Sequence, residues 1–229
     1  MDWQLAQYLP LAVLGAVLGL DVVSFPQAMV SRPIVASTLA GALLGQPVRG
    51  LTMGVLLEFF ALESLPFGAS RYPEWGSAAV VGGSLFAAVP DGMAGAMLVS
   101  AFAALVTASL GSSSMVFLRR WNAIWARGQQ RRIARGSGSA VVALQLAGLS
   151  ADLIRGGALT LVALVVFAPL HFAIVGTFTM SPVVSRAVVV SVASAVGLAA
   201  IWKVVRTTKG ARWWLAFGIG AGFVIAGSL

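Results

Sequence analysis

Two glutamates inside an otherwise apolar stretch are the residues best placed to do chemistry. Glu58 and Glu63 fall within the run Leu51–Leu65, whose sequence is LTMGVLLEFFALESL. A carboxylate can accept hydrogen bonds from adjacent hydroxyl groups of a ligand. Ionisable side chains at membrane depth are costly and mark functional sites or paired charges. Glu58 is therefore the first candidate for a binding site, and the alternative is a structural ion pair with Arg32 or Arg71.

Other polar residues near Glu58 are weaker candidates. Gln27 and Ser31 are short-range hydrogen-bonding groups that precede the apolar run Pro33–Leu44. Arg32 either points into a cavity or anchors the chain at lipid headgroups, and anchoring is favoured. Glu63 is either a second site residue or an interfacial acid. Glu74 lies in a connector, where an exposed loop acid is the simpler interpretation.

The remaining polar residues of the apolar segments indicate structural roles. His171 has no second histidine and no acid near it in sequence, so we expect a packed histidine and no metal site. Asp152 and Arg155 are three residues apart and can pair on one helix face. The lack of cysteine excludes a disulfide framework and a cysteine nucleophile.

The composition indicates an integral membrane protein. Hydrophobic residues make up 59% of the 229 positions and charged residues only 10%, whereas soluble domains carry about 25% charged residues. The apolar runs are continuous and do not alternate with polar residues, which favours helices over a membrane barrel. The formal net charge is +8, but the arginines cluster in short segments, as in loops that set membrane orientation. Nucleic-acid binding is therefore not expected.

The runs Pro33–Leu44 and Leu51–Leu65 predict a re-entrant hairpin. They are separated by the turn-like segment Gly45–Gly50, and the first run has only twelve residues. A straight transmembrane helix needs roughly 20. Acids and irregular backbone at membrane depth are tolerated where protein or a water-filled cavity surrounds them. We expect the hairpin to line a polar cavity.

The whole chain reads as one membrane-embedded domain, residues 1–229, with an all-α polytopic fold. Its first half, 1–118, holds the hairpin at 31–66; a basic loop, 119–139, leads to the second half, 140–229. A short apolar run, Ala78–Val89, and an amphipathic or partly inserted helix, Ala140–Arg155, lie between the crossings. The predicted crossings are Leu5–Val23, Met93–Leu118, Gly156–Phe178, Val183–Trp202 and Trp213–Leu229.

The basic segments predict the orientation of the chain in the membrane, and a repeated sequence pattern predicts an internal symmetry. The basic segments 119–139 and 203–212 are expected in the cytoplasm, and Trp121 and Trp125 fit an interfacial helix within the first. With this orientation the hairpin enters and leaves on the cytoplasmic side and Met1 lies outside. Ser31–Val35 and Ser181–Val184 open similar apolar runs, which favours an internal inverted repeat of the kind found in transporters.

The hairpin region resembles a known transport family. The segments SRPIVASTLAG (Ser31–Gly41), Gly-x-x-x-Glu (Gly54–Glu58), Phe67–Ala69 and Tyr72–Glu74 resemble the IIC subunit of the mannose/fructose/sorbose class of the sugar phosphotransferase system. The similarity is specific in the first third of the chain and looser beyond it, where it continues through Leu153–Arg155, Ser181–Val184 and the Gly218 region.

The resemblance implies a permease subunit that is not an enzyme on its own and needs no cofactor. Its expected partners are a IID membrane subunit and phosphoryl-carrying IIA and IIB proteins, with IIC–IID units forming a trimer in the lipid of a bacterial cytoplasmic membrane. The sugar would bind near the hairpin, with Gln27, Ser31, Arg32, Glu58, Glu63 and Glu74 as candidate contacts, and would move inward for phosphorylation by IIB.

Some positions differ from the family pattern and motivate an alternative. Ser31 stands where many members have histidine, and Met29 stands where glutamine is expected. Glu63-Ser64 replaces a usual Gly-Trp, and Glu74 replaces aspartate. The alternative is a derived scaffold or sensory subunit of the same family that does not transport sugar.

Overall fold

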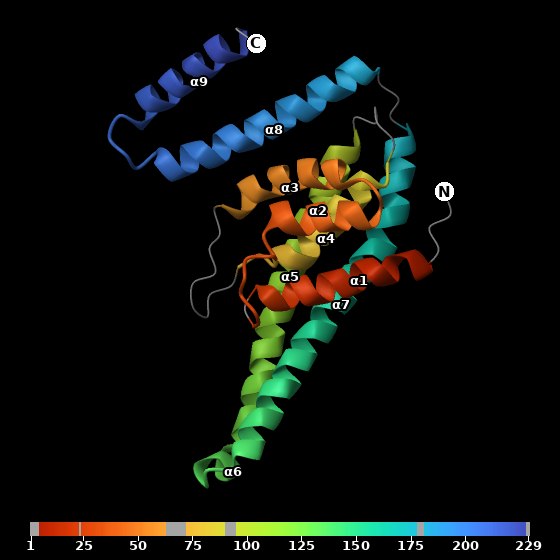
Figure 1. The fold of residues 1–229 in the computed structure, drawn as a ribbon, viewed down its shortest axis with the longest axis vertical. Helices are drawn as coiled ribbons and strands as arrows, with labels where there is room; N and C mark the ends of the chain where they lie inside the picture. The colour runs from red at the N-terminus through yellow and green to blue at the C-terminus, as the bar shows by residue number, and fades with distance from the viewer. Residues whose placement is uncertain (1–4, 23, 63–71, 90–94, 178–180, 228–229) are drawn as a thin grey trace.

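Helices form all the regular structure in the residues that the computed structural model describes, which are 5–22, 24–62, 72–89, 95–177 and 181–227. The predicted all-α membrane fold is confirmed, because three helical segments are long and apolar enough to cross a bilayer: Gly95–Gly128, Gly138–Thr177 and Arg186–Lys203. Figure 1 shows the arrangement of the helices, which are α1 (Leu5–Asp21), α2 (Pro33–Leu43), α3 (Pro47–Ala61), α4 (Trp75–Ala87), α5 (Gly95–Gly128), α6 (Gln130–Ala134), α7 (Gly138–Thr177), α8 (Pro182–Val205) and α9 (Ala211–Gly227).

The short helix α4 is the centre around which the other helices pack. Every residue of α4 is buried, and α1, α2, α3, α5 and α7 all contact it. Small residues permit this close packing. A Cβ atom on Gly83 would lie 2.7 Å from the Cα atom of Ser37 in α2, and one on Gly76 would lie 2.6 Å from the carbonyl oxygen of Leu18 in α1. An apolar helix with no polar face is expected to be enclosed in this way.

The predicted hairpin is present as the antiparallel pair α2 and α3, with a shorter turn than expected. The expected turn to Gly50 is wrong, because Pro47 opens α3 at its first position, where proline is favoured. Gly45 makes the turn with φ of 73°. The arms have 11 and 15 residues, or about 16 and 22 Å at about 1.5 Å per residue. Both are shorter than the roughly 30 Å hydrocarbon core, and the re-entrant path stays a prediction.

The expected loop at 119–139 is largely helical. Helix α5 continues beyond Leu118 through Trp121 and Trp125 to Gly128, and α6 follows, so the two tryptophans belong to α5. No proline or glycine occurs between Leu118 and Arg127, and arginine is a good helix former. The positive charge therefore does not mark irregular backbone. In Figure 1, α5 and α7 extend together beyond the other helices and are joined at α6.

The expected division of residues 140–178 into two segments is also wrong. Helix α7 runs without interruption over 40 residues and includes Pro169. Gly156 and Gly157, at the expected boundary, lie within the helix. Their lack of a side chain lets α1 pack closely against this part of α7. A Cβ atom on Gly156 would lie 3.0 Å from the carbonyl oxygen of Gly15. The polar residues before the glycines, Asp152 and Arg155, pair in the interior and do not end the helix.

Helices α8 and α9 form a separate antiparallel pair at the edge of the bundle (Figure 1). Helix α8 contacts α3, where a Cβ atom on Gly197 would lie 3.3 Å from the ring of Phe59. Helices occupy the two predicted segments within about three residues, apart from 228–229, which lie outside the described residues. Among the described residues of this pair, only Arg186–Lys203 in α8 is long and apolar enough to cross a membrane. Pro33 and Pro182 both open helices, but α2 has 11 residues and α8 has 24, so the inverted repeat stays a prediction.

Candidate functional site

Glu58 closes the open end of the α2–α3 hairpin. Its Oε1 pairs with a guanidinium nitrogen of Arg32, and its Oε2 accepts a hydrogen bond of 3.1 Å from the backbone N–H of Ile34. The first N–H groups of a helix have no partner within it, and a negative charge there is favourable. The pairing with Arg32 named as the alternative therefore exists. The two side chains still keep 26% and 18% of their surface exposed, so a ligand can reach them.

The segment between α1 and α2 is shaped by a buried acid at the end of α1. Asp21 is 2% exposed and accepts backbone N–H bonds of 2.7 Å from Ala28 and 2.9 Å from Ser31. Gln27 and Met29 take positive φ values of 59° and 62°, which few residues other than glycine adopt. The expected crossing to Val23 therefore ends earlier, at Asp21. This residue was not singled out as a candidate, although an acid after an apolar helix was a usable signal.

Glu74 is an interior residue, and its interpretation as an exposed loop acid is wrong. It is 1% exposed and caps α4, accepting a 3.2 Å bond from the backbone N–H of Ser77 at Oε1. It faces α5, where a Cβ atom on Gly111 would lie 2.6 Å from the Cβ of Glu74. Among the described residues, no hydrogen bond reaches its Oε2. A connector residue becomes buried here because α4 itself is enclosed.

The predicted Asp152–Arg155 pair is confirmed, and it belongs to a wider network. Arg155 Nε donates to Asp152 Oδ1 over 2.9 Å, and Arg155 Nη1 donates to Ser114 Oγ on α5 over 3.2 Å. The other oxygen of Asp152 accepts a hydrogen bond from the hydroxyl of Ser24, in the segment after α1. The network ties that segment to α5 and α7, which sequence reasoning did not find.

His171 is a packed histidine, as expected. It is fully buried, and its Nε2 lies 2.9 Å from Ser100 Oγ on α5. Its ring stands edge-on to Phe172, with 5.5 Å between ring centroids. Within the described ranges, no group of three His, Asp or Glu side chains could hold a metal ion.

Comparison with known families decides the broad class of this protein. The family model described as the sorbose-specific IIC component of the phosphotransferase system matches residues 5–229. The chain belongs to this family. No protein with a curated description matches the chain. The IIC component is thus a membrane-embedded sugar-transport subunit that works with other components of the phosphotransferase system.

The IIC component brings only part of its predicted site together. Arg32 and Glu58 meet at the hairpin end. Ser31 directly precedes Arg32 in sequence, and Gln27 lies in the segment that Asp21 shapes. Glu74 instead joins the interior where α1, α4 and α5 meet. Glu63 lies outside the described residues.

Proposed function

We propose that this IIC component binds a sugar at the open end of the α2–α3 hairpin and moves it inward for phosphorylation by a IIB partner. The observation that carries the proposal is the partly exposed Arg32–Glu58 pair, placed beside the segment that holds Gln27 and Ser31. The pair offers both donors and acceptors to hydroxyl groups.

The chemistry of the pair suits an uncharged ligand. A carboxylate accepts from two hydroxyls, and a guanidinium donates in a fixed plane. Hydrogen bonds to charged groups are stronger than those between neutral groups. Because the two charges compensate each other, a neutral sugar can bind between or beside them without leaving either charge alone. Glu63 stays a predicted contact outside the described residues, whereas the buried Glu74 is left out of the proposed hairpin-end contacts.

The proposal includes an assembly and an orientation. The expected partners are a IID membrane subunit and the phosphoryl carriers IIA and IIB, and IIC–IID units would form a trimer in the bacterial cytoplasmic membrane. Family membership supports a multi-component system. The segment from Arg119 to Arg135 has six arginines and no acid, which supports a cytoplasmic location for this end of α5 and α7.

Uptake of labelled sugars tests the function directly. Cells that express the chain with its IID, IIA and IIB neighbours are given a panel of hexoses, amino sugars and hexitols. We expect one class to accumulate in phosphorylated form. If no sugar accumulates while the complex is assembled and the carriers are phosphorylated, the transport function fails. The derived scaffold or sensory role, motivated by the departures at Met29, Ser31 and Glu63, would replace it.

Cysteine labelling tests the orientation. Helices α5 and α7 have 34 and 40 residues, about 51 and 60 Å, and so exceed the roughly 30 Å hydrocarbon core. Their joined end can therefore lie in water. The chain has no cysteine, so Ser137→Cys gives a single label site. We expect a membrane-impermeant maleimide to label it in inside-out vesicles and not in intact cells.

Two further single-cysteine variants act as controls for the labelling. Thr208→Cys, in the second basic segment, should give the same pattern as Ser137→Cys. Asp91→Cys, which we expect outside in the proposed orientation, should give the opposite pattern. Labelling of Ser137→Cys in intact cells would contradict the proposed orientation.

A further inference from the structure

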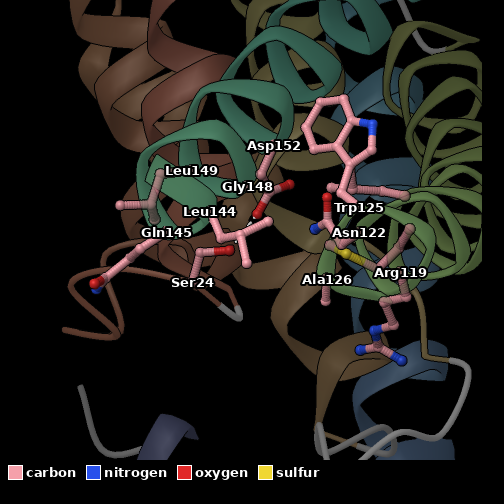
Figure 2. A pocket seen from close by; sticks show the side chains of 12 residues that line it. Ser24, Arg119, Asn122, Trp125, Ala126, Leu144, Gln145, Gly148, Leu149 and Asp152 are labelled. Atoms are coloured by element: carbon pink, nitrogen blue, oxygen red, sulfur yellow. Dashed lines mark hydrogen bonds between the residues drawn. The ribbon is translucent and has the colours of Figure 1, made fainter. Parts of the chain in front are cut away.

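A cavity of about 540 Å³ lies where the segment after α1 meets α5 and α7. This volume falls within the roughly 300–1,000 Å³ range of small-molecule sites. Figure 2 shows Arg119, Asn122 and Trp125 on the α5 side, Leu144, Gln145 and Leu149 on the α7 side, and Ser24 between them. None of the proposed sugar contacts at the hairpin end lines this cavity.

Two polar groups of the cavity can each accept a further hydrogen bond from a ligand hydroxyl. Asn122 Oδ1 is buried, and among the described residues no hydrogen bond reaches it. A buried acceptor without a partner is costly, and a ligand hydroxyl would satisfy it. The Ser24 hydroxyl donates a hydrogen bond to Asp152, so its oxygen can still accept one from a ligand.

Both charges that line the cavity are already engaged with protein groups. Asp152 is held by Arg155 and by Ser24. Arg119 donates to the hydroxyl of Tyr72 over 2.9 Å, and its guanidinium carbon lies 5.4 Å from the centroid of the Tyr72 ring. A charged ligand would therefore have to displace an existing partner, whereas an uncharged ligand with hydroxyl groups would not.

The apolar part of the lining fits the carbon face of a sugar ring. Trp125 packs edge-on against Trp121, with ring centroids 6.1 Å apart and an interplanar angle of 71°, so its orientation is supported by a neighbour. Met115 and Leu144 also line the cavity. Aromatic rings combine a large apolar face with a fixed geometry, and a sugar ring offers C–H groups on its faces and hydroxyls at its edge.

We propose that this cavity is a binding subsite for an uncharged sugar or polyol, in addition to the hairpin end. The inference rests on the proposed transport function. Ser24 of the cavity and Arg32 of the hairpin end are the two ends of one short segment, which Asp21 holds through the backbone of Ala28 and Ser31. Sugar at either place therefore contacts the same segment, and the cavity lies toward the arginine-bearing end of α5 and α7.

Binding to the purified complex with its IID partner in lipid nanodiscs tests the subsite. The ligands are D-mannose, D-fructose, L-sorbose and D-glucitol, with hexose 6-phosphates as charged analogues. Asn122→Leu removes the unpartnered acceptor. Ala126→Trp fills the cavity and leaves every polar group in place. We expect each variant to weaken sugar binding at least about tenfold, or about 1.4 kcal/mol, while the complex still assembles.

A matched variant separates cavity filling from a general effect of a new tryptophan. Ala123 and Ala126 are both exposed on α5, but only Ala126 lines the cavity. Ala123→Trp should bind sugar as the unmodified protein does. Unchanged affinity in both Asn122→Leu and Ala126→Trp would overturn the subsite and leave the transport function standing.

The other outcomes address the class of ligand. Tighter binding of hexose 6-phosphates than of free hexoses would overturn the uncharged class. If octyl glucoside binds and none of the free sugars competes with it, the cavity holds a glycolipid-like headgroup and the proposal is overturned. If the unmodified complex binds no sugar and accumulates none in the uptake assay, the transport function fails and the subsite fails with it.

Discussion

Replacing Glu58 by glutamine is expected to weaken sugar binding and uptake strongly while assembly with the IID partner persists. Glutamine can still accept the hydrogen bond from the Ile34 N–H, but it no longer offers a charged acceptor to sugar hydroxyls. Hydrogen bonds to charged groups contribute about 1.5–3 kcal/mol, which corresponds to about a ten- to hundredfold loss of affinity. Arg32 keeps 26% of its side-chain surface exposed and so remains hydrated. Equilibrium binding and co-purification with IID measure the two effects.

A charge reversal distinguishes sugar binding from structural pairing. The double variant Arg32→Glu/Glu58→Arg keeps an ion pair across the hairpin end but places a cation where the carboxylate was. We expect it to assemble and not to bind sugar. If it binds sugar like the unmodified protein, Glu58 acts only as the partner of Arg32. Unchanged affinity in Glu58→Gln alone would also remove Glu58 from the site.

Replacing Asp152 by alanine is expected to be among the most destabilising single changes in this protein. The side chain of Arg155 is only 9% exposed, and without Asp152 its charge would lie in the interior uncompensated. Removing one partner of a buried ion pair costs about 3–5 kcal/mol. The variant also loses the bond from Ser24, which ties the segment after α1 to α7. Thermal unfolding in a mild detergent measures the loss.

Two comparisons show whether the stranded charge causes that loss. In Asp152→Ala/Arg155→Met the interior charge is gone, so most of the lost stability should return. Arg120→Ala, at an exposed position on α5, should change stability by no more than about 0.5 kcal/mol. A double variant as unstable as Asp152→Ala would show that packing, and not charge, accounts for the effect.

The sequence was sufficient for the fold class but not for the centre of the fold. Continuous apolar runs and Pro33 were enough to predict membrane helices and the first arm of the hairpin. The run around Ala78 looked like one short apolar segment among several. What makes α4 central is that Gly76 and Gly83 let α1 and α2 come into contact with its backbone, and the pattern of a single segment does not show how many neighbours it has.

The errors in α5 and α7 have a common physical origin. From sequence, Arg119 and its neighbours predict the start of a loop, and Asp152 and Arg155 predict the polar part of an amphipathic helix. In the structure, Arg119 has Tyr72 as a partner, and the other two have each other, Ser24 and Ser114. These partners come from distant parts of the chain. Polar residues within a helix therefore cannot be placed until their partners are known.

Only part of the candidate site could be predicted from the sequence. The pairing of Arg32 with Glu58 could be named as an alternative because only a few opposite charges occur near Glu58 in sequence. The burial of Glu74 could not be predicted, because it depends on the enclosure of α4 and on Gly111 in α5. Asp21 was overlooked because its partners are backbone N–H groups, which leave no trace in residue type.

The way Asp21 holds the segment after α1 has a consequence for how sugar preference can change during evolution. Asp21 binds the main chain of Ala28 and Ser31, so these two contacts do not depend on which side chains stand at positions 28 and 31. A substitution at position 31 therefore keeps the backbone bond to Asp21 and loses only the contact of the Ser31 hydroxyl. Positions 27 and 29, with positive φ, are open mainly to glycine, asparagine and other residues that tolerate that geometry. A transporter built in this way can acquire a new substrate through a few changes in one short segment while its helix packing stays the same.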